Sequence, residues 1–304
     1  MRYKISICIE LFRIYFVTLY PDYQVKPDNR YMKHKNISFQ SNALLEHFLK
    51  SNQLCFTSTE ALGVLPGVSE GTVRELLSDM AKRGLLMRIK KGLYYIIPFD
   101  QDPETFIPDW HLLVEHLVNG NRYYIGYYSA LQLHQLITQP SLNELIVTDH
   151  QIKPAVIKVR DITFQFIYHN EKHFFGSKKI WVDSFNKVIS SDLEKTFVDC
   201  LFQPDYAGGI VEVGKALYMA KATIDFKKLL DYCIKFDSQA VIKRLGFLLE
   251  LFKIDTPIIK DLQELKTSSY ILLDTEMVKE GKRLSRWNIQ QNIDSETIQS
   301  SILT

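Results

Sequence analysis

Residues 69–82 combine side chains suited to nucleic-acid recognition with a spacing that places them on one face of a helix. Serine and threonine contact bases or phosphates, arginine pairs with guanine, and glutamate accepts a hydrogen bond from cytosine. The small Ser69 and Gly71 let the N-terminus of the helix approach a phosphate, whose charge the helix dipole favours. The residues expected to contact DNA on this face are Ser69, Gly71, Thr72, Arg74, Glu75, Ser78 and Lys82.

A run of cations follows the same helix, at Lys82, Arg83, Arg88, Lys90 and Lys91. A basic hairpin tip can contact phosphates or enter the minor groove, so we expect Arg88, Lys90 and Lys91 to bind DNA. The formal net charge of only +2 conceals this local cluster. Acids at Glu70, Glu75 and Asp79 repel phosphate and support an alternative, in which the surface contacts a protein and its lysines are merely solvated.

Local patterns predict the elements that position these residues. Residues 42–51 place apolar side chains on one helical face. Thr57 and Glu60 form a capping box that starts a short helix, which Pro66-Gly67 ends. A further helix begins after Ser69, its N-cap.

The second helix and the segment after it complete the pattern. Val73, Leu76, Leu77, Met80 and Ala81 form a buried stripe, and Gly84 ends the helix. The following residues read as a β-hairpin turning at Lys90-Lys91-Gly92, where Gly92 supplies a positive φ. Residues 41–98 are therefore predicted to form a winged helix-turn-helix domain.

The rest of the chain predicts a larger mixed domain. Residues 99–108 are rich in proline and acids and are expected to be a linker. Residues 109–304 alternate helical and strand patterns, so the fold class is α+β. Helices are predicted at 110–118, 127–136, 209–221, 225–236 and 238–252, and strands within 144–149, 155–161, 162–169, 269–274 and 286–290. A further helix is expected after Ser191, which forms a capping box with Glu194.

The first 31 residues fit neither domain. They contain an apolar stretch, but Glu10 and Arg13 interrupt it and no signal cleavage site follows. The stretch is also too short and too charged to span a membrane. We expect residues 1–31 to be a loose extension, or to have been included because the gene start was assigned too early and translation begins at Met32.

Other chemistry is weakly supported. The histidine pairs His111/His116 and His169/His173 lack a third ligand at metal-binding spacing, so no metal site is expected. The four cysteines are widely separated, which is typical of a reduced cytoplasm, and no motif indicates a cofactor. Gly208-Gly209 is expected to be a turn before a helix whose N-terminus could bind an anion.

The segment GTVRELLSDMAKRGLLMRIKKGLYYI resembles the N-terminal winged helix of the AbiEi antitoxins of AbiE-type (type IV) toxin–antitoxin, abortive-infection systems. The resemblance continues through NRYYIGYYSALQLHQL, SDLEKTFVDCLFQPDYAGGIVEV, VIKRLGFLLELF and, more weakly, YILLD and RWNIQQNI. It covers most of residues 41–292. The joined segments IGYYSAL, SDLEKTFVDCL and GGIVEV are its more specific part.

The resemblance implies a bacterial phage-defence regulator with two activities. The winged helix would bind double-stranded promoter DNA and repress the chain's own operon, while the larger domain would counteract a nucleotidyltransferase toxin. From the residues themselves we expect no catalytic side chain, no cofactor and no membrane contact, and direct contact with the toxin stays open. The chain itself lacks the paired-acid motif with which a nucleotidyltransferase holds magnesium.

Two alternatives remain open from the residues. The larger domain could be a ligand sensor, making the chain a plain winged-helix transcription factor. It could instead be an enzyme that modifies the toxin or its target through Glu194 or Asp199. Acids in the first turn of a helix stabilise its dipole, which explains Glu194 without catalysis.

Overall fold

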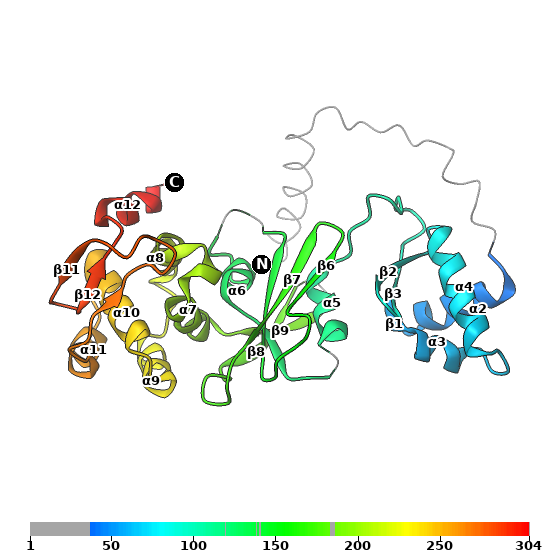
Figure 1. The fold of residues 1–304 in the computed structure, drawn as a ribbon, viewed down its shortest axis with the longest axis horizontal. Coiled ribbons are helices and arrows are strands. Elements are labelled where there is room, and N and C mark those ends of the chain that lie inside the picture. Colours follow the sequence, from blue (N-terminus) through cyan, green and yellow to red (C-terminus); the bar gives the residue numbers. More distant parts are fainter. Residues whose placement is uncertain (1–36, 119, 138, 140, 183–185, 304) are drawn as a thin grey trace, which may run out of the picture. The chain divides into compact units, whose positions relative to one another are not determined.

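The computed structural model describes residues 37–303 except 119, 138, 140 and 183–185. The expected extension at residues 1–31 lies outside the described residues. The chain forms two compact units, one ending at Phe106 and one beginning at Ile107, and each mixes helices with β-strands (Figure 1). The fold class is therefore α+β.

The smaller unit has the element order helix, strand, two helices and a β-hairpin. Its three strands form an antiparallel sheet in the order β1-β3-β2. Its elements are α2 (Phe39–Lys50), β1 (Cys55–Thr57), α3 (Ser58–Val64), α4 (Glu70–Lys82), β2 (Leu86–Lys90) and β3 (Leu93–Ile96).

The local signals in this unit act as predicted. Thr57 and Glu60 form the capping box of α3, and the Ser69 side chain accepts a hydrogen bond from the Thr72 amide to cap α4. The α4 stripe is buried at Val73, Leu77 and Met80, where it packs with α2 and the sheet into one hydrophobic cluster. Gly84 takes a positive φ of 70° just after α4, as the stop signal requires.

The larger unit is built around a six-stranded mixed sheet in the order β6-β7-β5-β4-β9-β8. The β5–β7 and β4–β9 pairs are parallel, and the remaining neighbours are antiparallel. Its strands are β4 (Tyr123–Ile125), β5 (Asn143–Thr148), β6 (Val156–Val159), β7 (Ile162–Tyr168), β8 (Ser177–Trp181) and β9 (Lys187–Ser191).

Helices cover both faces of this sheet. On one face, His111 of α5 contacts Glu144 of β5. On the other face, Val147 of β5 joins the hydrophobic cluster formed with α6, α7 and the helices that follow. The helices are α5 (Trp110–Leu117), α6 (Tyr127–Leu133), α7 (Leu193–Phe202), η2 (Pro204–Ala207), α8 (Gly209–Ala220), α9 (Phe226–Phe236), α10 (Gln239–Leu251) and α11 (Ile258–Leu265).

A second, three-stranded sheet follows these helices in the order β10-β12-β11. Just before β12, Trp287 lies against Gly246 of α10, where a Cβ atom would come within 2.2 Å of the indole ring. Glycine at 246 therefore lets this tryptophan bury itself to 1% exposure. The remaining elements are β10 (Ile271–Leu272), β11 (Lys282–Leu284), β12 (Ile289–Gln291), α12 (Ser295–Ser300) and η3 (Ser301–Leu303).

The predicted start of α7 is wrong by one residue. Asp192, rather than Ser191, is the N-cap, and its side chain accepts a hydrogen bond from the Lys195 amide. Ser191 still belongs to β9 and pairs with Ser177 of β8, so its backbone cannot yet turn into the helix. Its hydroxyl instead lies 2.7 Å from that of Thr196.

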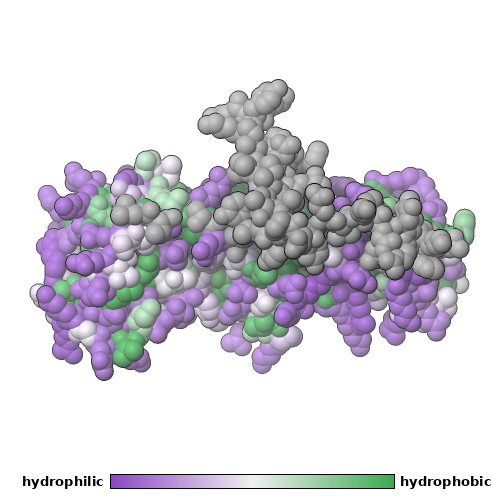
Figure 2. Space-filling view, turned by 90° about the horizontal axis from the view of Figure 1, so that it is seen from above, coloured by the Kyte–Doolittle hydropathy of each residue, from purple (hydrophilic) through white to green (hydrophobic). Residues whose placement is uncertain are grey.

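The described surface is mainly hydrophilic in the view of Figure 2. On the face shown in Figure 2, hydrophilic residues cover most of the described surface, and hydrophobic residues form small separate spots. Within the described ranges, no helix is long and apolar enough to cross a bilayer.

Candidate nucleic-acid interface

The polar face of α4 is fully presented to solvent. All seven residues that the sequence assigns to this face are exposed, whereas the Val73–Leu77–Met80 stripe on the opposite side is buried. The Ser69 and Thr72 hydroxyls lie 2.8 Å apart at the start of the helix, so the cap is closed by its own side chains. The structure thus brings the predicted residues of α4 together on one accessible surface.

Most charges on α4 are paired within the helix. Arg74 forms an ion pair with Glu70, and Arg83 forms one with Asp79 at 3.0 Å, both one turn apart. In the described residues, Glu75 and Lys82 have no such partner. Both pairs have the four-residue spacing at which side chains meet on a helix, and each arginine has a single acid at such a position, so the sequence carried the signal for these pairs.

The β2–β3 hairpin holds the remaining predicted cations. Lys91 and Gly92 form its two-residue turn, and Gly92 has the predicted positive φ, at 77°. The Gly92 carbonyl accepts a hydrogen bond of 2.8 Å from the Ser58 amide at the start of α3, which ties the hairpin tip to the helix pair. This tether was not evident from the sequence.

The three cations of the hairpin are not equivalent. Arg88 and Lys91 are exposed, and no acid pairs with either in the described part of the chain. Lys90 is half-buried near Cys55, and this burial lowers the pKa of its ammonium group. The pairing register shifts between Arg88 and Lys90. Arg88 and Lys91 are the exposed cations of the hairpin, so they carry its accessible charge.

Gly208-Gly209 forms the expected turn before α8, and the helix N-terminus, where an anion could bind, is occupied by a side chain of the chain itself. Gly208 is the N-cap of α8 and offers no side chain. The carboxylate of Asp274, 1% exposed, instead accepts a hydrogen bond of 2.7 Å from the Ile210 amide. The positive end of the α8 dipole is therefore already matched by a negative charge of the protein itself.

The two acids considered for catalysis are held by different lysines. Glu194 accepts a hydrogen bond of 2.8 Å from Lys228, while Asp199, fully buried, forms an ion pair with the equally buried Lys195. Within the described residues, no group of three or more metal-binding side chains could hold an ion.

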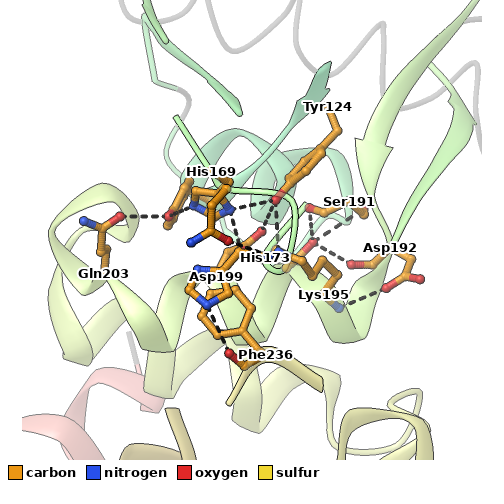
Figure 3. Close-up of polar contacts among 12 residues, drawn as sticks. Tyr124, His169, His173, Ser191, Asp192, Lys195, Asp199, Gln203 and Phe236 are labelled. Atoms are coloured by element: carbon orange, nitrogen blue, oxygen red, sulfur yellow. Dashed lines mark hydrogen bonds and ion pairs between the residues drawn. The ribbon is translucent and has the colours of Figure 1, made fainter. Parts of the chain in front are cut away.

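Asp199 belongs to a buried polar network that includes Tyr124 of β4, His169 just after β7 and Lys195 of α7 (Figure 3). The Tyr124 hydroxyl donates to Asp199 at 3.0 Å and accepts from Lys195 at 3.0 Å. His169 lies between two tyrosines, with Nδ1 3.3 Å from the Tyr124 hydroxyl and Nε2 2.8 Å from the Tyr127 hydroxyl. The four-residue spacing of Lys195 and Asp199 on a predicted helix was the sequence signal for this network.

Comparison with known proteins supports the fold. No family model matches the chain, and no curated protein sequence matches it. Among solved structures, the chain is similar to the crystal structure of the RV2827C protein from Mycobacterium tuberculosis, with a TM-score of 0.64, 14% sequence identity, and coverage of 88% of this chain and 96% of that chain. At this identity, the similarity concerns the arrangement of the backbone.

Proposed function

We propose that the chain is a bacterial antitoxin and transcriptional autorepressor whose smaller unit is a winged helix-turn-helix that binds promoter DNA. The observation that carries this proposal is the exposed polar face of α4, which follows α3 directly and precedes a hairpin with an exposed basic tip. In helix-turn-helix proteins, the second helix of the pair enters the major groove and the flanking elements contact the backbone.

The charge distribution supports a division of labour in DNA binding. Lys82, Arg88 and Lys91 are exposed cations without an acidic partner among the described residues, so they are suited to phosphates. Glu75 is the acid on α4 that no arginine neutralises within the described chain, and the amino group of cytosine would supply the donor that its carboxylate needs. Three phosphate contacts predict a salt slope of roughly −3 for each bound copy.

The test is fluorescence anisotropy of the full chain on its own upstream DNA and on scrambled DNA, over a salt series. We expect specific binding that weakens with salt. Replacing both exposed hairpin cations, as Arg88→Gln/Lys91→Gln, should reduce the slope by about 2, because two phosphate contacts are lost. Lys50→Gln is the matched control, since Lys50 is exposed on α2 and pairs with Glu46.

Two outcomes would contradict the DNA-binding proposal. Equal affinity for upstream and scrambled DNA would make the smaller unit a protein-contact module. Specific binding with an unchanged salt slope in the hairpin variant would instead remove the hairpin from the interface.

The antitoxin part of the proposal rests on the AbiEi resemblance of the larger unit. We expect co-expression of the chain to restore growth to cells that produce the nucleotidyltransferase encoded beside it. The Arg88→Gln/Lys91→Gln variant should still do so, because its changes lie in the smaller unit. Failure to restore growth, together with a small ligand that changes operator affinity, would favour the ligand-sensing alternative.

The alternative in which the larger unit is an enzyme acting through Glu194 is tested by the variant Glu194→Gln. Glu194→Gln keeps the shape of a side chain that accepts a hydrogen bond from the Asp225 amide at 3.1 Å. Under the proposal, this variant restores growth as the unaltered chain does. Loss of rescue in a chain that still folds would support catalysis through Glu194.

A further inference from the structure

An exposed tryptophan lies among lysines at one edge of the central sheet. β8 is the edge strand, and its register pairs Trp181 with Lys187 of β9. Lys179, two residues before Trp181, points to the same face of the sheet. We call Lys179, Trp181 and Lys187 the Trp181 patch; its β8–β9 hairpin can be followed in Figure 1.

The patch is exposed and basic. The Trp181 side chain is 61% exposed, and both lysines are exposed. The Lys187 ammonium lies 4.1 Å from the centre of the indole ring. The described strands β8 and β9 carry a third lysine, Lys178, and no acid, and no acid elsewhere in the described chain pairs with Lys179 or Lys187.

Protection of the sheet edge explains only part of this arrangement. Lysines on an edge strand discourage pairing with a second sheet, which accounts for Lys178 and Lys179. The same principle disfavours a large aromatic side chain in solvent at that edge. Trp181 packs into neither of the two hydrophobic clusters described above, so it makes no contribution to them that would explain its type.

We propose that the Trp181 patch binds single-stranded nucleic acid, with a base stacked on the indole ring and neighbouring phosphates on Lys179 and Lys187. Aromatic rings beside cations are the recurring way in which proteins hold unpaired strands, because every base has a face that can stack. A phosphate bound by Lys187 brings its nucleoside directly to the ring. In a duplex, the bases are stacked on one another and cannot reach such a ring, so the patch fits a single strand.

The tryptophans of the chain allow a direct test. Trp287 is 1% exposed and Trp110 is half-buried, so Trp181 is the indole most accessible to a ligand. The full chain carrying Arg88→Gln/Lys91→Gln, which removes hairpin cations of the smaller unit, is titrated with 12-nucleotide oligouridine, oligothymidine and a duplex of equal length. Quenching of tryptophan fluorescence and anisotropy of the labelled strands are recorded over a salt series.

Three variants locate the binding. Trp181→Ala should abolish the quenching and weaken single-strand binding about tenfold or more. Lys179→Gln/Lys187→Gln should reduce the salt slope by about 1.4. Lys158→Gln/Lys279→Gln, which removes two exposed lysines elsewhere in the unit, should bind as the parent does.

Three outcomes would overturn the proposal. Single-strand binding that survives Trp181→Ala unchanged places the site elsewhere, and equal binding of the duplex removes the preference for unpaired bases. Quenching by polyglutamate but not by either oligonucleotide would identify a protein-binding surface instead. A preference between oligouridine and oligothymidine separates RNA from DNA as the source of the strand. Promoter binding is measured on the unaltered chain, and the single-strand titrations use the chain that carries Arg88→Gln/Lys91→Gln. The two proposals can therefore fail independently of each other.

Discussion

His169 is the residue in which burial and hydrogen bonding conflict most clearly. It is 3% exposed and lies between the Tyr124 and Tyr127 hydroxyls. Burial lowers the pKa of His169 to about 4, although the nearby Asp199 carboxylate acts in the opposite direction. The Lys195 ammonium, which already neutralises Asp199, adds to the lowering. The histidine is therefore held neutral inside the network.

This state predicts how stability depends on pH. An unfolded histidine has a pKa of about 6.5, so between about pH 6.5 and pH 4 the unfolded chain binds more protons at this position than the folded chain. The contribution of neutral His169 is thus complete above pH 6.5 and is lost as the pH falls to 4, by about 3 kcal/mol at most. Urea unfolding of the larger unit at a series of pH values measures this loss.

The variant His169→Gln isolates the effect. Glutamine does not titrate, so the stability difference between the original chain and the variant should shrink as the pH falls from 6.5 to 4. His47→Gln, in the smaller unit, is the control and should leave the pH dependence of the larger unit unchanged. A difference that stays constant over this pH range would mean that His169 is not held neutral.

At the scale of elements, α8 is capped by a residue from the other end of the larger unit. The helix begins at two glycines with positive φ, Gly208 and Gly209. The carboxylate of Asp274, in the segment after β10, accepts a hydrogen bond from the Ile210 amide. The same carboxylate accepts a hydrogen bond of 2.9 Å from the Glu276 amide, and this bond stabilises the turn to which Asp274 belongs. Asp274 therefore joins α8 to the small C-terminal sheet.

Asp274→Ala should lower the free energy of unfolding by about 2 kcal/mol, because the variant leaves a buried amide at a helix N-terminus without an acceptor. Asp274→Asn keeps one acceptor oxygen and should recover part of the loss. Glu276→Ala, at an exposed position, is the control for the same turn. Chemical denaturation followed by circular dichroism makes the comparison, and equal stability of the Ala and control variants would show that Asp274 is not the cap.

These elements also show how far the sequence could predict the fold. α4 was predictable because its cap, stripe and stop lie within one segment, and Gly92 marked the hairpin turn for the same reason. β1 and β4 have three residues each and exist through distant partners, β3 and β5, so local patterns could not reveal them. Asp274 caps a helix 64 positions away along the chain, and the shift from Ser191 to Asp192 depends on strand pairing. For the candidate interface, the residue positions followed from periodicity, but the partial burial of Lys90 did not.

At the scale of the whole molecule, each unit has a hydrophobic cluster of its own. The smaller cluster includes Phe48, Phe56 and Leu77, and the larger one includes Phe197, Leu248 and Trp287. Separate clusters predict that damage to one core leaves the other intact, because packing free energy is lost where the contacts are lost. The proposed activities, promoter binding in one unit and neutralisation in the other, should then be separable by mutation.

Leu77→Ala and Leu248→Ala test this separation, since both leucines are fully buried. Each should destabilise its own unit by about 2–5 kcal/mol. All three tryptophans lie in the larger unit, so tryptophan fluorescence should report a lowered transition for Leu248→Ala and an unchanged one for Leu77→Ala. Hydrogen exchange of the α4 amides should give the reverse pattern, with protection lost in Leu77→Ala alone. If either substitution shifted both signals, the two units would unfold as one cooperative body, and a mutation in one core could not be used to assign an activity to that unit.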